Sequence, residues 1–326
     1  MKISLESIAK NSEKIFYRLR WGDRIVCPKC GSVHIYNFEV GQLHICADCG
    51  NRFSDTSGTI FHSTKLSLSQ WLYAIYMFCQ STRGVSSYAL ARMIGVSQPT
   101  AWNMLRKIRV AIKHDIEIPD GAILDEVFIG SDWKRIPSFK KYMKATPPKP
   151  VWNLKGKDLK DYYKCEFMCL ANADKRAVLG ISAPFSRSIV LLAFDTSDRK
   201  EFVRRALNER YSTYIAQPNL DQRPVIITDQ GKYYNCVTEF KTESGQQLFQ
   251  HEICRHDQNK YASENGFSSN RLEGAFSHLK RMWRGVYQRW SREHNQSYLN
   301  EFSWRHTHRD KSLQQRLKML FTFFCI

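Results

Sequence analysis

Apolar side chains recur at helical spacing through the first third of the chain. A stripe of four apolar residues among charged neighbours predicts an amphipathic helix over residues 1–20. Ser67 then precedes an apolar stretch that runs to Cys79, which is typical of a capped helix. The chain should therefore begin with helical structure. The stripe consists of Ile8, Ile15, Phe16 and Leu19.

Residues 86–112 show two helical patterns separated by a short break. Gly95, Val96 and Ser97 form the break, and Pro99 falls in the first turn of the second pattern. This arrangement resembles a helix-turn-helix, although an ordinary helical hairpin would produce the same pattern. The second helix would offer these polar side chains to DNA: Gln98, Thr100, Asn103, Arg106, Lys107 and Arg109.

From about residue 120 the apolar period changes from helical to alternating. Residues 122–130 predict a strand with Asp125 on the same face as Ile123 and Val127. Residues 166–174 and 177–184 predict a hairpin of two more strands, 198–211 a helix, 224–229 a strand, and the segment after 266 one long helix. The order indicates an α/β domain with a mixed sheet flanked by helices. The basic, aromatic segment 131–162 resembles an inserted loop.

Four cysteines near the N-terminus have the spacing of a zinc ribbon. They form two C-x2-C pairs, and a glycine follows each pair. Four thiolates leave no open coordination position, which favours a structural rather than a catalytic zinc ion. His34 and His44, between the pairs, are interpreted as surface residues. The ligands are Cys27, Cys30, Cys46 and Cys49.

The excess of basic over acidic residues indicates which class of molecule the protein binds. The 326 residues include 49 Lys and Arg against 31 Asp and Glu, a net charge of +18, and basic residues near the C-terminus alternate with aromatic ones. This favours double-stranded DNA as the partner over a merely soluble basic protein. No apolar run is long enough for a membrane span, so the apolar end at Leu317–Ile326 is expected to be a docked terminal element. Six scattered further cysteines indicate a reducing cytoplasm.

Three acids could form a metal site. Ionised Asp125 on a buried strand face would cost several kcal/mol unless it is compensated, and a divalent cation would compensate it. Asp229 ends an apolar strand, and Glu273 shares a helix face with Asn270 and Lys280. Such oxygen ligands suit two Mg2+ or Mn2+ ions and phosphoryl-transfer chemistry. Each acid alone could equally be a surface or capping residue.

His251, Cys254 and His256 allow a second metal site. Their irregular spacing and the missing fourth ligand favour a packing or DNA-contacting role instead.

These motifs together resemble the insertion-sequence DDE transposases with an N-terminal zinc ribbon, the ISXO-like group related to the Merlin elements. The resemblance rests on both cysteine pairs, LDEVFIG, IITDQGKYY, HEICRH and NRLEGAFSHLKR. It implies an RNase H-like domain that cuts and joins DNA with Mg2+ at the terminal inverted repeats of its element. Asp125, Asp229 and Glu273 match the acid triad, and Lys280 matches the accompanying basic residue. Asn270 and His256 would support the site.

Two features depart from the pattern of that group: the insertion after Gly130, and Ser268 where histidine is common.

The sequence thus predicts an N-terminal helix with a zinc ribbon at 1–60, a helical DNA-binding region at 61–118 and a catalytic domain at 119–326. The predicted function is a cytoplasmic transposase that acts as a homo-oligomer on element ends and target DNA. The alternatives are a catalytically silent DNA-binding protein derived from a transposase, and a nuclease of the same fold that acts on particular nucleic-acid structures or on RNA-containing substrates.

Overall fold

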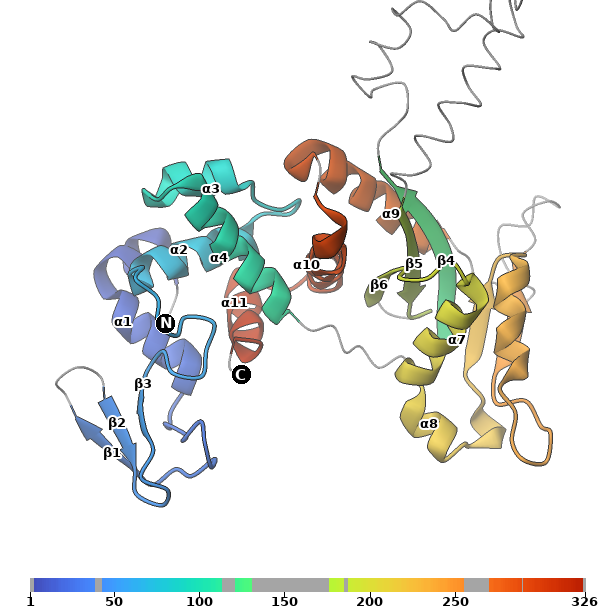
Figure 1. The fold of residues 1–326 in the computed structure, drawn as a ribbon, viewed down its shortest axis with the longest axis horizontal. Coiled ribbons are helices and arrows are strands. Elements are labelled where there is room, and N and C mark those ends of the chain that lie inside the picture. Colours follow the sequence, from blue (N-terminus) through green and yellow to red (C-terminus); the bar gives the residue numbers. More distant parts are fainter. Residues whose placement is uncertain are drawn as a thin grey trace, which may run out of the picture. The chain divides into compact units, whose positions relative to one another are not determined.

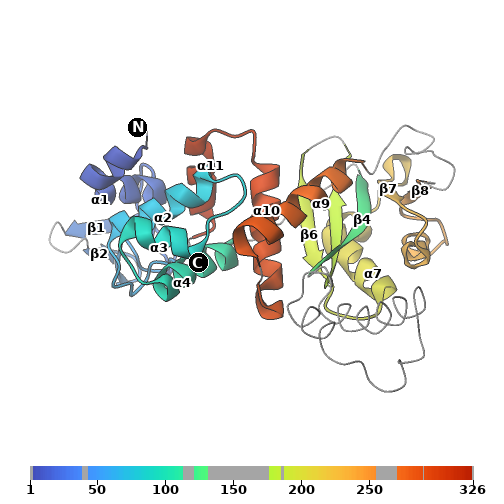
Figure 2. The ribbon, with the colours of Figure 1, turned by 90° about the horizontal axis from the view of Figure 1, so that it is seen from above.

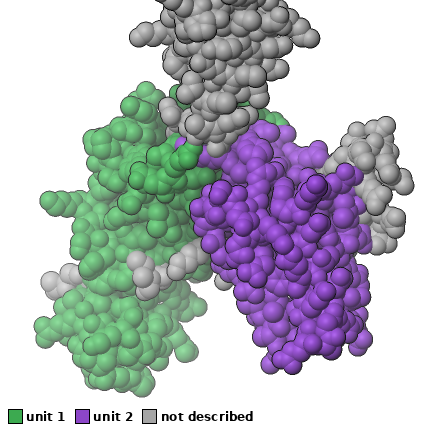
Figure 3. Space-filling model, turned by 45° about the vertical axis from the view of Figure 1, so that its right-hand side comes forward, with its two compact units in different colours: residues 1–116, 185–190, 281–326 green, residues 117–184, 191–280 purple. Residues whose placement is uncertain are grey.

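The computed structural model describes residues 3–38, 43–112, 121–130, 176–184, 187–254, 270–288 and 290–324. The chain forms two compact units (Figure 3). Unit 1 consists of residues 1–116, 185–190 and 281–326, and unit 2 consists of residues 117–184 and 191–280. Unit 1 therefore combines the N-terminal region with the C-terminal end of the chain, whereas the sequence pattern assigns all of 119–326 to one domain.

The N-terminal part of unit 1 consists of helix α1 (Leu5–Trp21) and a small antiparallel sheet (Figure 1). Ser4 and Ser7 form a capping box that begins α1, and the predicted stripe is buried on it. The sheet has the order β1 (Ile35–Phe38), β2 (Leu43–Cys46), β3 (Arg52–Ser54). Cys46 ends β2 and Cys49 lies in the turn between β2 and β3, while Cys27 and Cys30 lie in a turn that precedes β1.

Five further helices complete unit 1. The predicted cap at Ser67 begins α2, where its side chain accepts a hydrogen bond from the Gln70 amide. Gly95 adopts the left-handed conformation between α3 and α4, and Pro99 lies in the first turn of α4, so the predicted helix pair and its turn are present. The helices are α2 (Leu68–Gln80), α3 (Ser87–Ile94), α4 (Gln98–Ala111), α10 (Asn295–Thr307) and α11 (Leu313–Thr322).

The core of unit 1 joins residues from both ends of the chain. The ring of Phe61, 1% exposed, lies 5.1 Å from those of Phe16 and Trp71, and 5.5 Å from that of Phe324. Trp304 of α10 and Leu317 of α11 belong to the same cluster. The apolar C-terminal end is therefore a docked part of this core, as its pattern predicts.

Unit 2 is built on a five-stranded mixed sheet in the order β6-β5-β4-β7-β8 (Figure 2). Strand β4 pairs antiparallel with β5 and parallel with β7, and β7 pairs parallel with β8. The strands are β4 (Gly121–Ile129), β5 (Arg176–Ser182), β6 (Ile189–Ala193), β7 (Val225–Thr228) and β8 (Gln250–Ile253).

Helices α7 (Arg199–Arg210) and α9 (Asn270–Met282) contact opposite faces of this sheet. A β-carbon at Gly180 of β5 would lie 2.7 Å from the Phe276 ring, so α9 packs directly on β5. Gly180 pairs with Asp125, while the next residue, Glu126, faces the other way and bonds Arg199 of α7. Shorter helical segments lie at Ser212–Ala216 (α8), Leu220–Gln222, Lys232–Glu239 and Arg292–His294.

The predicted elements differ from the described structure at two strands and at the C-terminal helix. Strands β6 and β8 were not expected, because neither short segment has a distinctive apolar period. The expected single helix after residue 266 is instead α9, a π-helical turn at Trp283–Tyr287, and then α10 and α11, since Gln288 takes a positive φ of 55°. The strand expected at 166–174 and the insertion at 131–162 lie outside the described residues.

Within the described part of the chain, we find no helix with both the length and the apolar character that a bilayer span requires.

Candidate functional site

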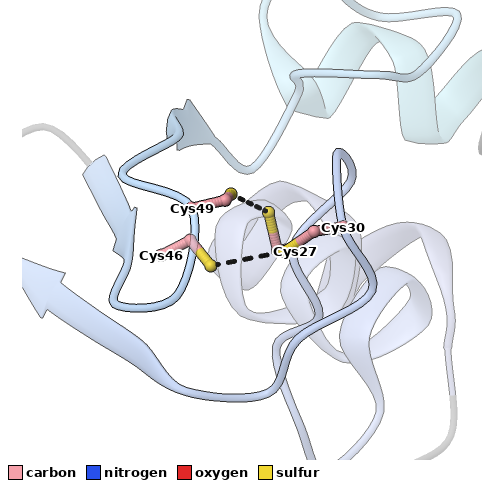
Figure 4. A group of neighbouring side chains, drawn as sticks. All are labelled: Cys27, Cys30, Cys46 and Cys49. Atoms are coloured by element: carbon pink, nitrogen blue, oxygen red, sulfur yellow. Dashed lines mark hydrogen bonds between the residues drawn. The ribbon is translucent and has the colours of Figure 1, made fainter.

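The four predicted zinc ligands lie together in unit 1 (Figure 4). Their sulfur atoms all lie within 4.8 Å of one another, with 3.7 Å between Cys27 and Cys49 and 3.6 Å between Cys30 and Cys46. A tetrahedral zinc ion with bonds of about 2.3 Å would separate its sulfur ligands by nearly this distance. The cluster therefore fits a structural zinc ion that closes the ribbon.

The glycine after each cysteine pair completes the knuckle turns. Gly31 and Gly50 have φ of 76° and 65°, and their amides donate to the carbonyls of Cys27 and Cys46. Residues with a β-carbon rarely adopt this conformation.

His44 is buried beneath the ribbon rather than on its surface, which corrects the sequence-based interpretation. It is 4% exposed, and its Nε2 lies 2.9 Å from Asp55 Oδ1. The indole of Trp21 donates to the same oxygen at 2.7 Å. His44 therefore links the ribbon to the end of α1 and is not a metal ligand. His34 is exposed, as predicted, and pairs with Asp48.

Five of the six side chains expected on the DNA-binding face of α4 are wholly or partly accessible. Asn103, Arg106 and Lys107 are exposed. Gln98 and Thr100 are partly exposed and bond to side chains of the preceding helix and turn, Ser87 and Ser97 respectively. Asn103 and Arg106 lie on the outward side of α4, whereas the Lys107 ammonium donates to the Ile60 carbonyl at 3.2 Å and lies 5.9 Å from the Trp71 ring centre.

Arg109, the sixth, does not fit a DNA-contacting role. It is 2% exposed, and its Nε donates to Glu301 Oε2 at 2.7 Å. Glu301 is fully buried and also accepts from Arg305 and from the Tyr287 hydroxyl. The helical period alone cannot separate this inward-facing arginine from its exposed neighbours, because its partner is distant in sequence.

Register places Asp125 and Asp229 side by side in unit 2. The parallel pairing of β4 and β7 matches Ile123 with Ile227, and both acids lie two residues farther on. Neighbouring strands are about 4.8 Å apart, so the two carboxylates project from adjacent positions. Asp229 accepts a hydrogen bond from the Gly231 amide, and both acids are partly buried.

Helix α9 places Glu273 within electrostatic range of this pair. The helix buries Leu272, Phe276 and Leu279, while its other side exposes Asn270, Glu273, Ser277 and Lys280 as predicted. Burial raises the pKa of Asp125 to about 6, and the charges of Asp229 and Glu273 add to this rise. The three acids therefore form one interacting cluster, which we call the acid cluster.

Carboxylates that repel one another in a partly buried place are a suitable donor set for a divalent cation. Their spacing is looser than that of the cysteines. Among the described residues, only the four cysteines bring three or more ligand atoms within 4.8 Å of one another. The acid cluster therefore suits a cation in charge and ligand type. The carboxylate oxygen atoms of the three acids do not all lie within 4.8 Å of one another.

The first four residues of the HEICRH motif, His251–Cys254, form the end of β8 and the position after it. His251 Nε2 lies 2.9 Å from the Thr228 hydroxyl, and burial lowers the pKa of His251. Cys254 is buried, and its amide donates to the Thr228 carbonyl. These contacts support the edge of the sheet next to Asp229, which agrees with a packing role. His256 lies outside the described residues.

Comparison with known families gives two matches. Residues 153–307 match the ISXO2-like transposase domain, and residues 11–52 match the transposase zinc-ribbon domain. A protein described as an uncharacterized protein in transposable element ISH50, from Halobacterium salinarum, is 22% identical over 129 residues. That alignment spans 38% of this chain and 43% of the relative. The resemblance seen in the sequence is thereby confirmed: the chain combines a region similar to the ISXO2-like transposase domain with one similar to the transposase zinc ribbon.

Proposed function

We propose that this protein is a DNA transposase that binds the terminal inverted repeats of its element and cuts and joins DNA strands there. The observation that carries the proposal is the acid cluster, in which Asp125 and Asp229 occupy neighbouring strand positions and Glu273 interacts with them. Because two element ends must be joined to one target, we expect the protein to act as a homo-oligomer.

The topology of unit 2 supports an RNase H-like catalytic domain. In chain order, the sheet runs 3-2-1-4-5, with its first two strands antiparallel and its central pair parallel. The two aspartates lie on strand 1 and just after strand 4, which are neighbours. Ligand and catalytic sites of α/β sheets commonly form at the carboxyl ends of such strands.

The helix pair α3 and α4 supports DNA recognition by a helix-turn-helix. Asn103, Arg106 and Lys107 would make the outermost contacts, with Gln98 and Thr100 at the start of the helix. Side chains at the start of such a recognition helix commonly reach base edges, and basic ones bind phosphates. The net charge of +18 supplies the general attraction to the DNA backbone.

Asp125, Asp229 and Glu273 would hold Mg2+ or Mn2+. Such ions activate a hydroxyl nucleophile and stabilise the leaving oxygen in phosphoryl transfer. Side chains of the protein would hold the DNA next to these ions. Lys280 lies seven residues beyond Glu273 on the same exposed side of α9, where its ammonium group can bind a DNA phosphate.

The Asp125→Asn variant tests this function. We expect strand cleavage with Mg2+ to fall to background, because a central carboxylate is lost, while binding to the same DNA is retained. The probe is a labelled duplex from the DNA that flanks the gene, and binding of Mn2+ is measured in parallel. Asp195→Asn is the matched control, because Asp195 is an exposed acid paired with Arg205. Cleavage by Asp125→Asn at the normal rate would refute the assignment.

A further inference from the structure

Arg199 occupies a built position beside the acid cluster. Its Nη1 donates to Glu126 Oε1 at 2.8 Å. Its guanidinium carbon lies 5.3 Å from the ring centre of Phe128 and 5.7 Å from that of Tyr233. Residues of strand β4 and of the segment after β7 thus contact the guanidinium group that helix α7 carries. We call Glu126, Phe128, Arg199 and Tyr233 the Arg199 cluster.

The Arg199 cluster adjoins two of the acids. Glu126 follows Asp125 directly in β4. A β-carbon at Gly231 would lie 3.0 Å from Asp229 Oδ1 and 2.9 Å from the Cζ atom of Tyr233. Only the width of a methyl group therefore separates the Asp229 carboxylate from the hydroxyl-bearing end of the Tyr233 ring.

The guanidinium group keeps donors for a further anion. Arginine has five N–H groups in a planar fork. Among the described residues, one of them is committed to Glu126, and the Arg199 side chain is 38% exposed. The aromatic neighbours fix its orientation by cation–π contact and leave the outward edge accessible. Such a fork suits a phosphate group.

The alternative is an ion pair that serves only stability. A partly exposed pair of this kind contributes little to stability. The cation is held by Glu126, the residue after Asp125, on the other face of the same strand. From there it would offset part of the repulsion between the acid cluster and DNA.

We propose that Arg199 binds a backbone phosphate of the DNA that passes the acid cluster, while Glu126, Phe128 and Tyr233 hold its guanidinium in place. This inference rests on the proposed transposase function and adds a phosphate-positioning residue to it, on the α7 side of the sheet. It is distinct from Lys280, which lies on α9 at the opposite face.

The test measures DNA affinity of the full chain as a function of salt, in an Asp125→Asn background that prevents cleavage. The probes are a duplex from the DNA that flanks the gene and a mixed-sequence duplex of equal length. The slope of log affinity against log salt is negative, and each lost phosphate contact lowers its magnitude by about 0.9. We expect Arg199→Gln to show this loss on both probes, and Arg199→Lys to keep the slope with weaker binding.

Arg205→Gln is the matched control. Arg205 lies on the same helix, pairs with the exposed Asp195 and contacts the Phe202 ring, so its removal changes the net charge equally. We expect its slope to equal that of the Asp125→Asn parent. Equal slopes for Arg199→Gln and Arg205→Gln, with a lower melting temperature only for the former, would show a purely structural pair and overturn the inference.

The test of the Arg199 phosphate contact can fail or succeed independently of the test of transposase activity. Affinity is measured without cleavage, so the slope change can appear even if the wild-type chain fails to cut DNA with Mg2+. That combination would reject the transposase activity and uphold the phosphate contact. Cleavage by the wild-type chain with an unchanged slope in Arg199→Gln would do the reverse.

Discussion

The alternating apolar pattern predicts the strand position of Asp125. It does not predict the pKa of Asp125, which depends on the folded protein. Burial, together with Asp229 and Glu273, raises its pKa to about 6. Below that pH the carboxyl group holds a proton, which a metal ion must displace. We expect Mn2+ affinity to fall about tenfold per pH unit below pH 6 and to level off above it, as measured by titration calorimetry.

The control for this pH profile is Asp195→Asn, which should leave it unchanged. Asp125→Asn should bind Mn2+ weakly at every pH in the range. A wild-type affinity that is flat from pH 5 to pH 7 would contradict a role for Asp125 as a ligand.

Glu301 shows what a residue pattern cannot predict. Burial would raise the pKa of Glu301, but Arg305 and Arg109 outweigh that effect and keep it below the ordinary value. Removing one member of such a buried pair typically costs about 3–5 kcal/mol. We expect Glu301→Gln to destabilise unit 1 by this order in urea unfolding. Glu201→Gln, which breaks an exposed pair with Arg204, should change stability by less than about 0.5 kcal/mol.

At the scale of elements, the sequence predicts best where the apolar period is long or caps mark an end. The helices α1, α2, α4 and α7 and the strands β4 and β7 follow their patterns, and Asp198 caps α7. The sheet register could not be predicted, because it depends on pairing between segments about 100 residues apart. Strands β6 and β8 and the π-helical turn were missed, since none of them has a periodic or capping signal.

The contact between α9 and β5 determines where Glu273 lies. A β-carbon at Gly180 would meet the Phe276 ring at 2.7 Å and Leu272 at 3.1 Å. Gly180→Ala should therefore displace α9, with a cost of about 1–3 kcal/mol and weaker Mn2+ binding. Both losses can be measured by thermal unfolding and calorimetry.

A second substitution tests that explanation. Phe276→Leu in the Gly180→Ala background should recover part of both losses, because it removes the ring that clashes. Gly274→Ala is the control on the same helix, where the added carbon meets nothing within 4 Å and should stabilise by about 0.5–1 kcal/mol. Unchanged Mn2+ binding in Gly180→Ala would mean that α9 does not position the acid cluster.

At the scale of the whole molecule, the net charge and the motifs indicate that the partner is DNA. The two compact units, however, each consist of segments that are not consecutive in the sequence. Residues 281–326 belong to the same compact unit as residues 1–116. Their apolar residues had predicted a docked end without showing where it docks. Because Leu90 of α3 and Leu105 of α4 share one hydrophobic cluster with Leu317 and Phe324, the helix pair proposed to bind DNA depends on the last residues of the chain.

That dependence can be tested with two adjacent residues of α11. Leu317 is 1% exposed in the core of unit 1, whereas Lys318 is exposed. Leu317→Ala should cost about 2–5 kcal/mol and reduce hydrogen-exchange protection in α2 and α4, because these helices share its core. Lys318→Ala should leave protection unchanged. If Leu317→Ala loosened only α11, the N-terminal helices would be stable on their own, and DNA binding would survive removal of residues 281–326.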